Sequence, residues 1–150
     1  MGNALSPVPK TFIHGIRIMC NILVIDDERM ISDLLQQALT IYGHNVETAS
    51  GGSDGLRIFE TGSFDLVITD IRMPDIDGIE VARCIRSSDK PQTPIIAMSG
   101  TPWLMNGNGF DFTIPKPFSI KILMDAVKEL TVNPMNSDTG HPNNTLSKLQ

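Results

Sequence analysis

Five residues of this sequence have the types and spacing that suit phosphoryl transfer: Asp26, Asp27, Asp70, Ser99 and Lys116. Each follows a short apolar run, which is where a buried strand would end. Three carboxylates held close together repel, and one would take up a proton unless a cation relieves the repulsion. Mg²⁺ prefers such oxygen ligands. Together with the lysine it would neutralise a phosphoryl group while a carboxylate oxygen attacks phosphorus in line.

Each of these residues also has an ordinary interpretation. The three aspartates could cap helices or stand in turns, and Lys116 between two prolines could be a solvated loop residue. Ser99 carries little weight by itself, although its hydroxyl could donate a hydrogen bond to a phosphoryl oxygen. The joint spacing favours a site, because polar groups at four strand ends in this order are hard to explain as caps alone.

The elements that must position these residues alternate between strands and helices, which predicts βαβ units and a parallel sheet. Five apolar, β-branched runs are expected to be strands: 21–25, 46–49, 66–68, 94–98 and 112–114. Helical periodicity predicts helices at 30–42, 51–61, 76–88 and 120–130. Ligands of open α/β sheets bind at the carboxyl ends of the strands, and there the polar residues would meet.

Length and composition fit one folded domain. The chain has 150 residues, of which 41% are hydrophobic and 19% charged, as in a globular protein with a single core. The net charge of −5 argues against nucleic acid as a direct partner. Cys20 and Cys84 match no disulfide or metal spacing and are expected to be reduced thiols of a cytoplasmic protein. No apolar run approaches the ~18 residues of a membrane span.

The sequence is expected to divide into three segments. Residues 1–19 are expected to be a flexible N-terminal extension, 20–131 the folded domain, and 132–150 a disordered tail rich in polar residues. The opening residues fit a bare myristoylation pattern, although an extension preceding a natural start at Met19 is the simpler interpretation. Residues 1–19 have no continuous apolar stretch and no cleavage site of the signal-peptide type.

The sequence resembles the receiver domain of two-component response regulators, the CheY-like family. The motifs that carry this resemblance are Val-Ile-Asp-Asp-Glu at 24–28, Asp-Ile-Arg-Met-Pro-Asp-Ile-Asp-Gly at 70–78, Ser-Gly at 99–100 and Lys-Pro-Phe at 116–118. The resemblance implies a flavodoxin-like, doubly wound α/β fold with five parallel strands in order 2-1-3-4-5. The fourth helix would be shortened or missing, because the segment from Ser99 to Lys116 is shorter than is common.

By this resemblance, Asp70 is the phosphoacceptor and takes its phosphoryl group from a histidine kinase or a histidine phosphotransfer protein. Ser99 would be the switch hydroxyl, and Lys116 would contact the phosphoryl group. Gly100 fits the small residue that leaves room for that group. Thr101 occupies a position that in such domains tunes how fast the aspartyl phosphate hydrolyses, as does Arg72.

The resemblance also implies the metal site. Asp27, Asp70 and the backbone carbonyl of Arg72 would bind Mg²⁺ directly, and Asp26 would hold it through water. The protein would not be an enzyme acting on a separate substrate. It would catalyse only its own Mg²⁺-dependent phosphorylation and dephosphorylation.

Two features depart from the family pattern. Thr113 takes the place usually held by a switch tyrosine or phenylalanine, with Phe112 one residue earlier. Trp103, in the short segment before it, is expected to pack over the missing helix or to be partly exposed. Both changes fall on the face through which receivers usually signal. The phosphorylation site is therefore expected to work, while the output face is altered.

The expected function is a stand-alone phosphoacceptor in the cytoplasm that switches the binding of an unknown downstream protein or passes the phosphoryl group on, without contact to nucleic acid or membrane. One alternative is a phosphorylation-independent, receiver-like interaction module. A second is a haloacid-dehalogenase-like phosphatase, because Asp75-Ile76-Asp77-Gly78 mimics its nucleophile motif. That motif needs a buried strand directly before it, and Arg72-Met73-Pro74 stands there instead.

Overall fold

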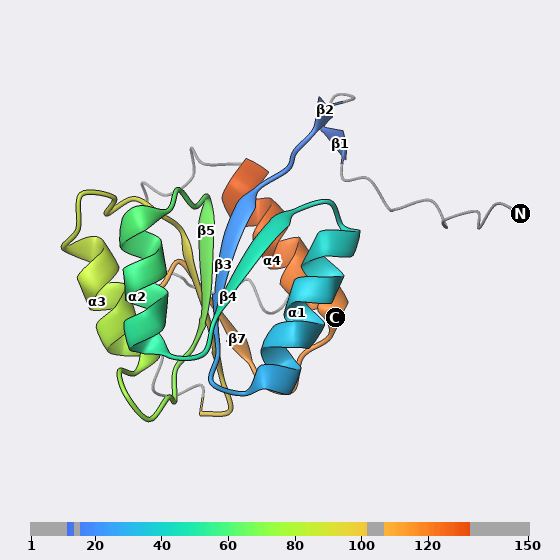
Figure 1. Ribbon diagram of the computed structural model, residues 1–150. Helices are drawn as coiled ribbons and strands as arrows, with labels where there is room; N and C mark the ends of the chain where they lie inside the picture. The colour runs from blue at the N-terminus through green and yellow to red at the C-terminus, as the bar shows by residue number, and fades with distance from the viewer. Residues whose placement is uncertain (1–11, 14–15, 102–106, 133–150) are drawn as a thin grey trace, which may run out of the picture.

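A computed structural model describes residues 12–13, 16–101 and 107–132 of the chain. Its centre is a parallel sheet with the strand order β4-β3-β5-β6-β7, which is 2-1-3-4-5 when these five strands are counted along the chain (Figure 1). The predicted flavodoxin-like fold is therefore confirmed. The strands are β3 (Asn21–Ile25), β4 (Asn45–Ala49), β5 (Leu66–Asp70), β6 (Ile95–Ser99) and β7 (Phe112–Pro115).

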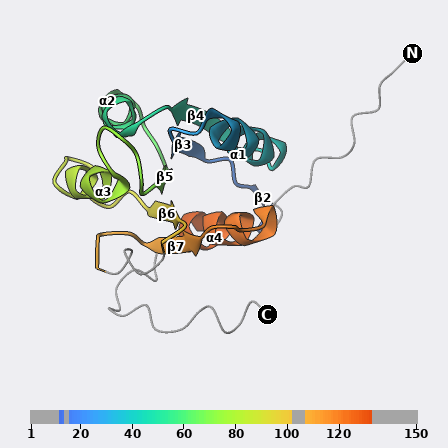
Figure 2. The ribbon, with the colours of Figure 1, turned by 90° about the horizontal axis from the view of Figure 1, so that it is seen from below.

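Helices cover both faces of the sheet (Figure 2). On one face lie α1 (Arg29–Ile41) and α4 (Ile120–Val132), and on the other lie α2 (Gly52–Thr61) and α3 (Gly78–Arg86). The strands run toward the lower edge in Figure 1, where α1 and α2 begin. In the part of the chain that the structure describes, no helix has the length and apolar character to cross a bilayer.

The core has two layers because alternate residues of a strand point to opposite faces of the sheet. Ile22 and Val24 of β3 pack in the layer beneath α1 and α4, whereas Leu23 and Ile25 pack beneath α2 and α3. All five residues of β5 and of β6 are buried. Strands buried on both faces appear in a sequence as continuous apolar runs, which is why β5 and β6 were predicted near their observed positions.

Helix α3 is shorter than the predicted helix 76–88. It begins at Gly78 because the carboxylate of Asp77 accepts a hydrogen bond from the backbone N–H of Glu80 at 2.8 Å. An aspartate that caps the first turn in this way fixes where a helix starts. At the other end, Ser87 is the C-cap, so the helix ends with Arg86.

The segment before β3 also differs from expectation, since regular structure was not predicted within residues 1–19. Two short strands, β1 (Phe12–Ile13) and β2 (Ile16–Arg17), pair as an antiparallel hairpin. Ile13 lies opposite Ile16 in the register, so two residues connect the strands. Hydrophobic residues on both sides of a two-residue connection are a hairpin signal that the sequence interpretation overlooked.

The connection between β6 and β7 contains no helix in its described residues, 100–101 and 107–111. The predicted shortening or loss of the fourth helix falls partly on residues 102–106, which lie outside the described residues. Arg86 of α3 holds this connection, because its guanidinium donates to the carbonyl of Gly109 at 2.8 Å and to the carboxylate of Asp111 at 2.6 Å. Phe110 packs against the small buried cluster of Ile71 and Ala97. The connection thus supplies some of the packing that a helix would give. Trp103 lies outside the described residues.

Candidate functional site

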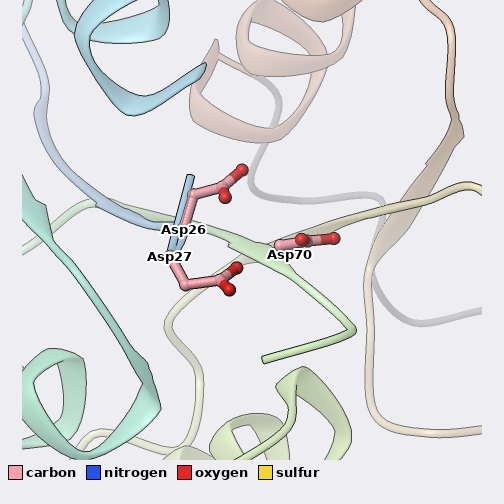
Figure 3. A group of neighbouring side chains, drawn as sticks. All are labelled: Asp26, Asp27 and Asp70. Atoms are coloured by element: carbon pink, nitrogen blue, oxygen red, sulfur yellow. The ribbon is translucent and has the colours of Figure 1, made fainter. Parts of the chain in front are cut away.

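Strand register places the acidic strand ends side by side. Ile25 of β3 lies opposite Thr69 of β5, so the next residues along these strands are Asp26 and Asp70. Figure 3 shows the side chains of Asp26, Asp27 and Asp70 extending to the same side of the sheet edge. Carboxylate oxygens, one from each residue, lie within 4.8 Å of one another. The three aspartates, which are far apart in the sequence in the case of Asp70, therefore form one cluster in the folded structure.

Lys116 faces this cluster from the far strand. Ser99 at the end of β6 lies opposite Pro115 at the end of β7, and the backbone N–H of Lys116 donates to the Ser99 carbonyl at 2.8 Å. The peptide bond between Lys116 and Pro117 is cis. The Lys116 Nζ lies 3.4 Å from Asp70 Oδ1 and 3.9 Å from Asp26 Oδ2. One ammonium group thus lies next to two buried carboxylates.

Burial dominates the electrostatics of the two inner aspartates. The pKa of Asp26 is raised from its ordinary value of 3.8 to about 6, chiefly by burial; the Glu28 N–H and the Lys116 charge lower it, and the negative charges of Asp70 and Glu28 add to the rise. Burial also raises the pKa of Asp70 above its usual value, against the opposing effects of the Lys116 charge and the Ile71 N–H. The single lysine therefore does not fully offset the cost of holding these carboxylates charged.

The residues fit a hard divalent cation. Asp26 Oδ1 accepts the Glu28 backbone N–H at 2.8 Å, whereas Oδ2 is buried and has no hydrogen-bond partner among the described residues. A buried oxygen without a partner is costly in a folded protein. Three clustered carboxylates are the hard oxygen donors that Mg²⁺ prefers. The N–H that Asp26 accepts belongs to Glu28, the N-cap residue, and not to the first turn of α1. This contact is therefore not an ordinary helix cap.

Of the predicted switch residues, Ser99 is the last residue of β6 and Thr113 lies within β7. Ser99 is buried, and its hydroxyl oxygen accepts the Thr101 N–H at 2.9 Å and lies 2.9 Å from the Thr101 hydroxyl. The Ser99 hydroxyl is thus linked to Thr101 through both the backbone N–H and the hydroxyl of that residue. Thr113 of β7 lies opposite Ala97 and is half-buried. The ring of Phe112 packs into the layer beneath α1 and α4, on the other face of the strand.

The loop between β5 and α3 carries Arg72 and two further carboxylates. The side chain of Arg72 is exposed, two residues beyond Asp70. Asp77 caps α3, and the carboxylate of Asp75 accepts backbone N–H groups at the start of α2. Both acidic residues of the phosphatase-like motif thus serve as helix caps. The sequence interpretation missed the role of Asp75, although the Gly51-Gly52 start of α2 leaves that helix without a cap of its own.

A doubly wound sheet whose carboxyl edge holds an acidic pair, a third aspartate and a lysine defines the receiver class of signalling domain. The chain matches the response regulator receiver domain family over residues 22–128 and belongs to that family, which works in two-component signalling. Receiver domains bind Mg²⁺ at an acidic pocket, accept phosphoryl groups and interact with histidine kinases or phosphotransfer proteins.

Relatives and solved structures agree with this assignment. The chain is 37% identical over 113 residues to "Probable transcriptional regulator ycf27" of Cyanidium caldarium and 34% identical over 113 residues to the response regulator MprA of Mycolicibacterium vanbaalenii. These matches cover 73% of this chain but only 45% and 49% of the relatives, so the chain covers about half their length.

Two solved structures show the same fold at useful sequence identity. The response regulator TrrA of Thermotoga maritima, solved in complex with Mg²⁺-BeF, is 37% identical, with a TM-score of 0.68 over 73% of this chain and 97% of that one. The chemotaxis response regulator CheY4 of Vibrio cholerae is 26% identical, with a TM-score of 0.71 over 75% of this chain and 99% of that one.

Proposed function

We propose that this domain accepts a phosphoryl group on Asp70 from a phosphohistidine of a histidine kinase or a histidine phosphotransfer protein. The observation that carries the proposal is the position of Asp70, which lies among two other aspartates and 3.4 Å from the Lys116 ammonium group. The Asp70 side chain is mostly buried but, at 8% exposed, still borders solvent. A donor could therefore reach it.

In the proposed reaction, an oxygen of Asp70 attacks the phosphorus atom of the donor. A bond from oxygen to phosphorus forms, the phosphorus–nitrogen bond of the phosphohistidine breaks, and its electron pair returns to the imidazole ring. Lys116 would place its positive charge beside the phosphoryl oxygens. The hydrogen bond of 2.9 Å from the Ile71 N–H to Asp70 Oδ1 would keep the carboxylate oriented during the attack.

Asp27, Asp70 and the Arg72 carbonyl would hold Mg²⁺, with Asp26 acting through water. When bound, the ion would supply positive charge that offsets both the carboxylates and the phosphoryl oxygens. The Ser99 hydroxyl would donate a hydrogen bond to a phosphoryl oxygen and would then no longer bond the Thr101 hydroxyl. Loss of that bond would couple phosphorylation to the position of Thr101.

The proposal also covers the domain's setting. We place it in the cytoplasm, with a downstream protein partner whose binding depends on phosphorylation. The sequence-based expectations of a stand-alone domain without nucleic-acid contact stay predictions, since the chain covers only about half the length of the matched relatives. Three of these relatives are named as transcriptional regulators.

Incubation with acetyl phosphate tests the proposal. With Mg²⁺, the intact mass should rise by one phosphoryl group, and chelation of the metal should abolish the increase. An Asp70→Asn variant that becomes labelled equally well would reject the site. Steady hydrolysis of a phosphomonoester would instead favour the phosphatase alternative, because a phosphoacceptor labels stoichiometrically. A folded protein that never labels would favour the phosphorylation-independent interaction module.

A further inference from the structure

Helix α2 takes its N-terminal cap from a distant loop. Its N-cap residue, Gly51, has no side chain with which to accept the first backbone N–H groups, which need partners. The carboxylate of Asp75, from the loop between β5 and α3, accepts the N–H of Gly52 at 3.2 Å and that of Ser53 at 2.9 Å. Asp75 thus joins segments that lie more than twenty residues apart in the sequence.

Small residues at the start of α2 make room for this contact. A Cβ atom at Gly52 would collide with the backbone carbonyl of Ile76, and a Cβ atom at Gly51 would lie 3.1 Å from the Asp75 oxygens. Two glycines therefore allow the loop to lie directly on the start of α2. Hydrogen bonds from the backbone N–H groups of Ser53, Ile76 and Gly52 keep the pKa of Asp75 well below its ordinary value.

The same loop is fixed a second time, beside the phosphoacceptor. The N–H of Gly78 donates to the carbonyl of Ile71 at 2.8 Å, which closes the loop at its base. A Cβ atom at Gly78 would collide with the backbone carbonyl of Asp70. Arg72 lies between the base of the loop and Asp75, so the path of the chain at Arg72 depends on both attachments.

We propose that Asp75 is a positioning residue for the metal site, which holds the Arg72 segment in place by anchoring the loop to α2. This inference rests on the proposed function, in which the Arg72 carbonyl is a metal ligand. Asp75 itself would not touch the ion. Its loss would weaken Mg²⁺ binding because the loop would then be fixed only at its base, and the Arg72 carbonyl would have to be ordered on binding.

Mg²⁺ binding to the whole chain, measured by calorimetry, tests the inference. Asp75→Ala should weaken the affinity by about tenfold, whereas Asp75→Asn, which keeps an acceptor oxygen, should recover most of it. Asp77→Ala is the matched control, because it removes the cap of α3 from the same loop and should change the affinity by less than about twofold. The amide proton signals of Gly52 and Ser53 should shift upfield in Asp75→Ala only.

Equal Mg²⁺ affinity of Asp75→Ala and wild type would overturn the inference alone, as would equal weakening in both alanine variants. In the first case Asp75 would serve only the stability of α2, and in the second any loosening of the loop, and not the contact of Asp75 in particular, would weaken the metal site. A wild-type protein that binds no Mg²⁺ would overturn the proposed function and this inference with it. The two failures are therefore distinguishable by the wild-type titration.

Discussion

Replacing Lys116 with methionine should slow the labelling of the protein by acetyl phosphate by about 100-fold, the scale seen when one preorganised charge is removed from a transition state. Lys116 is the cation nearest the site among the described residues, with its Nζ 3.4 Å from Asp70 Oδ1. Without it, the phosphoryl oxygens would meet the aspartates with less opposing charge. Rates of mass increase at saturating Mg²⁺ provide the measurement.

The same variant should bind Mg²⁺ at least as tightly as wild type. The ammonium group lies beside Asp26 and Asp70, so it repels a cation that enters the same cluster. Lys121→Met is the control, since the Lys121 ammonium is exposed on α4 and pairs with Asp125 at 2.8 Å. Labelling of Lys116→Met at the wild-type rate, or loss of its Mg²⁺ affinity, would contradict the proposed role of Lys116.

Without divalent cations, the protein should gain stability on the order of 1 kcal/mol from Asp26 as the pH falls from about 7.5 to about 5. Burial raises the folded-state pKa of Asp26 to about 6, from an ordinary value of 3.8. In this window the folded state binds more protons than the unfolded state does. The stabilising contribution is therefore present at low pH and is lost as the pH rises through the folded pKa.

Denaturant unfolding in a chelator isolates this effect when wild type is compared with Asp26→Asn. The variant cannot carry the charge, so it should be more stable than wild type at about pH 7.5, and the difference should shrink toward about pH 5. Added Mg²⁺ should raise the stability of wild type at the higher pH, because a ligand that binds the folded state stabilises it. A wild type that is the more stable of the two at high pH in the chelator would refute the account.

Local patterns explain why so much of the fold was predictable from the sequence. β3, β5 and β6 are buried on both faces, so each reads as an unbroken apolar run, and the polar residue at its end marks the sheet edge. Since parallel strands bring those ends together, the order of motifs was enough to predict the cluster of Asp26, Asp27 and Asp70 that the structure contains.

Features that depend on distant contacts were not predictable in the same way. The contact between Asp75 and α2 joins two loops whose approach is set by the packing of α2 on the sheet, and no local pattern encodes it. The start of α3 at Gly78 depended on which of several polar residues would act as its cap. The partner of the Ser99 hydroxyl, Thr101, follows from the backbone path after β6.

A crystal structure with Mn²⁺ in place of Mg²⁺ and beryllofluoride in place of the phosphoryl group tests the central claim most directly. We expect one anomalous peak bound by Asp27, Asp70 and the Arg72 carbonyl, with beryllofluoride on Asp70 and in contact with Lys116. Metal bound elsewhere, or beryllofluoride absent from Asp70 while the metal site is filled, would contradict it.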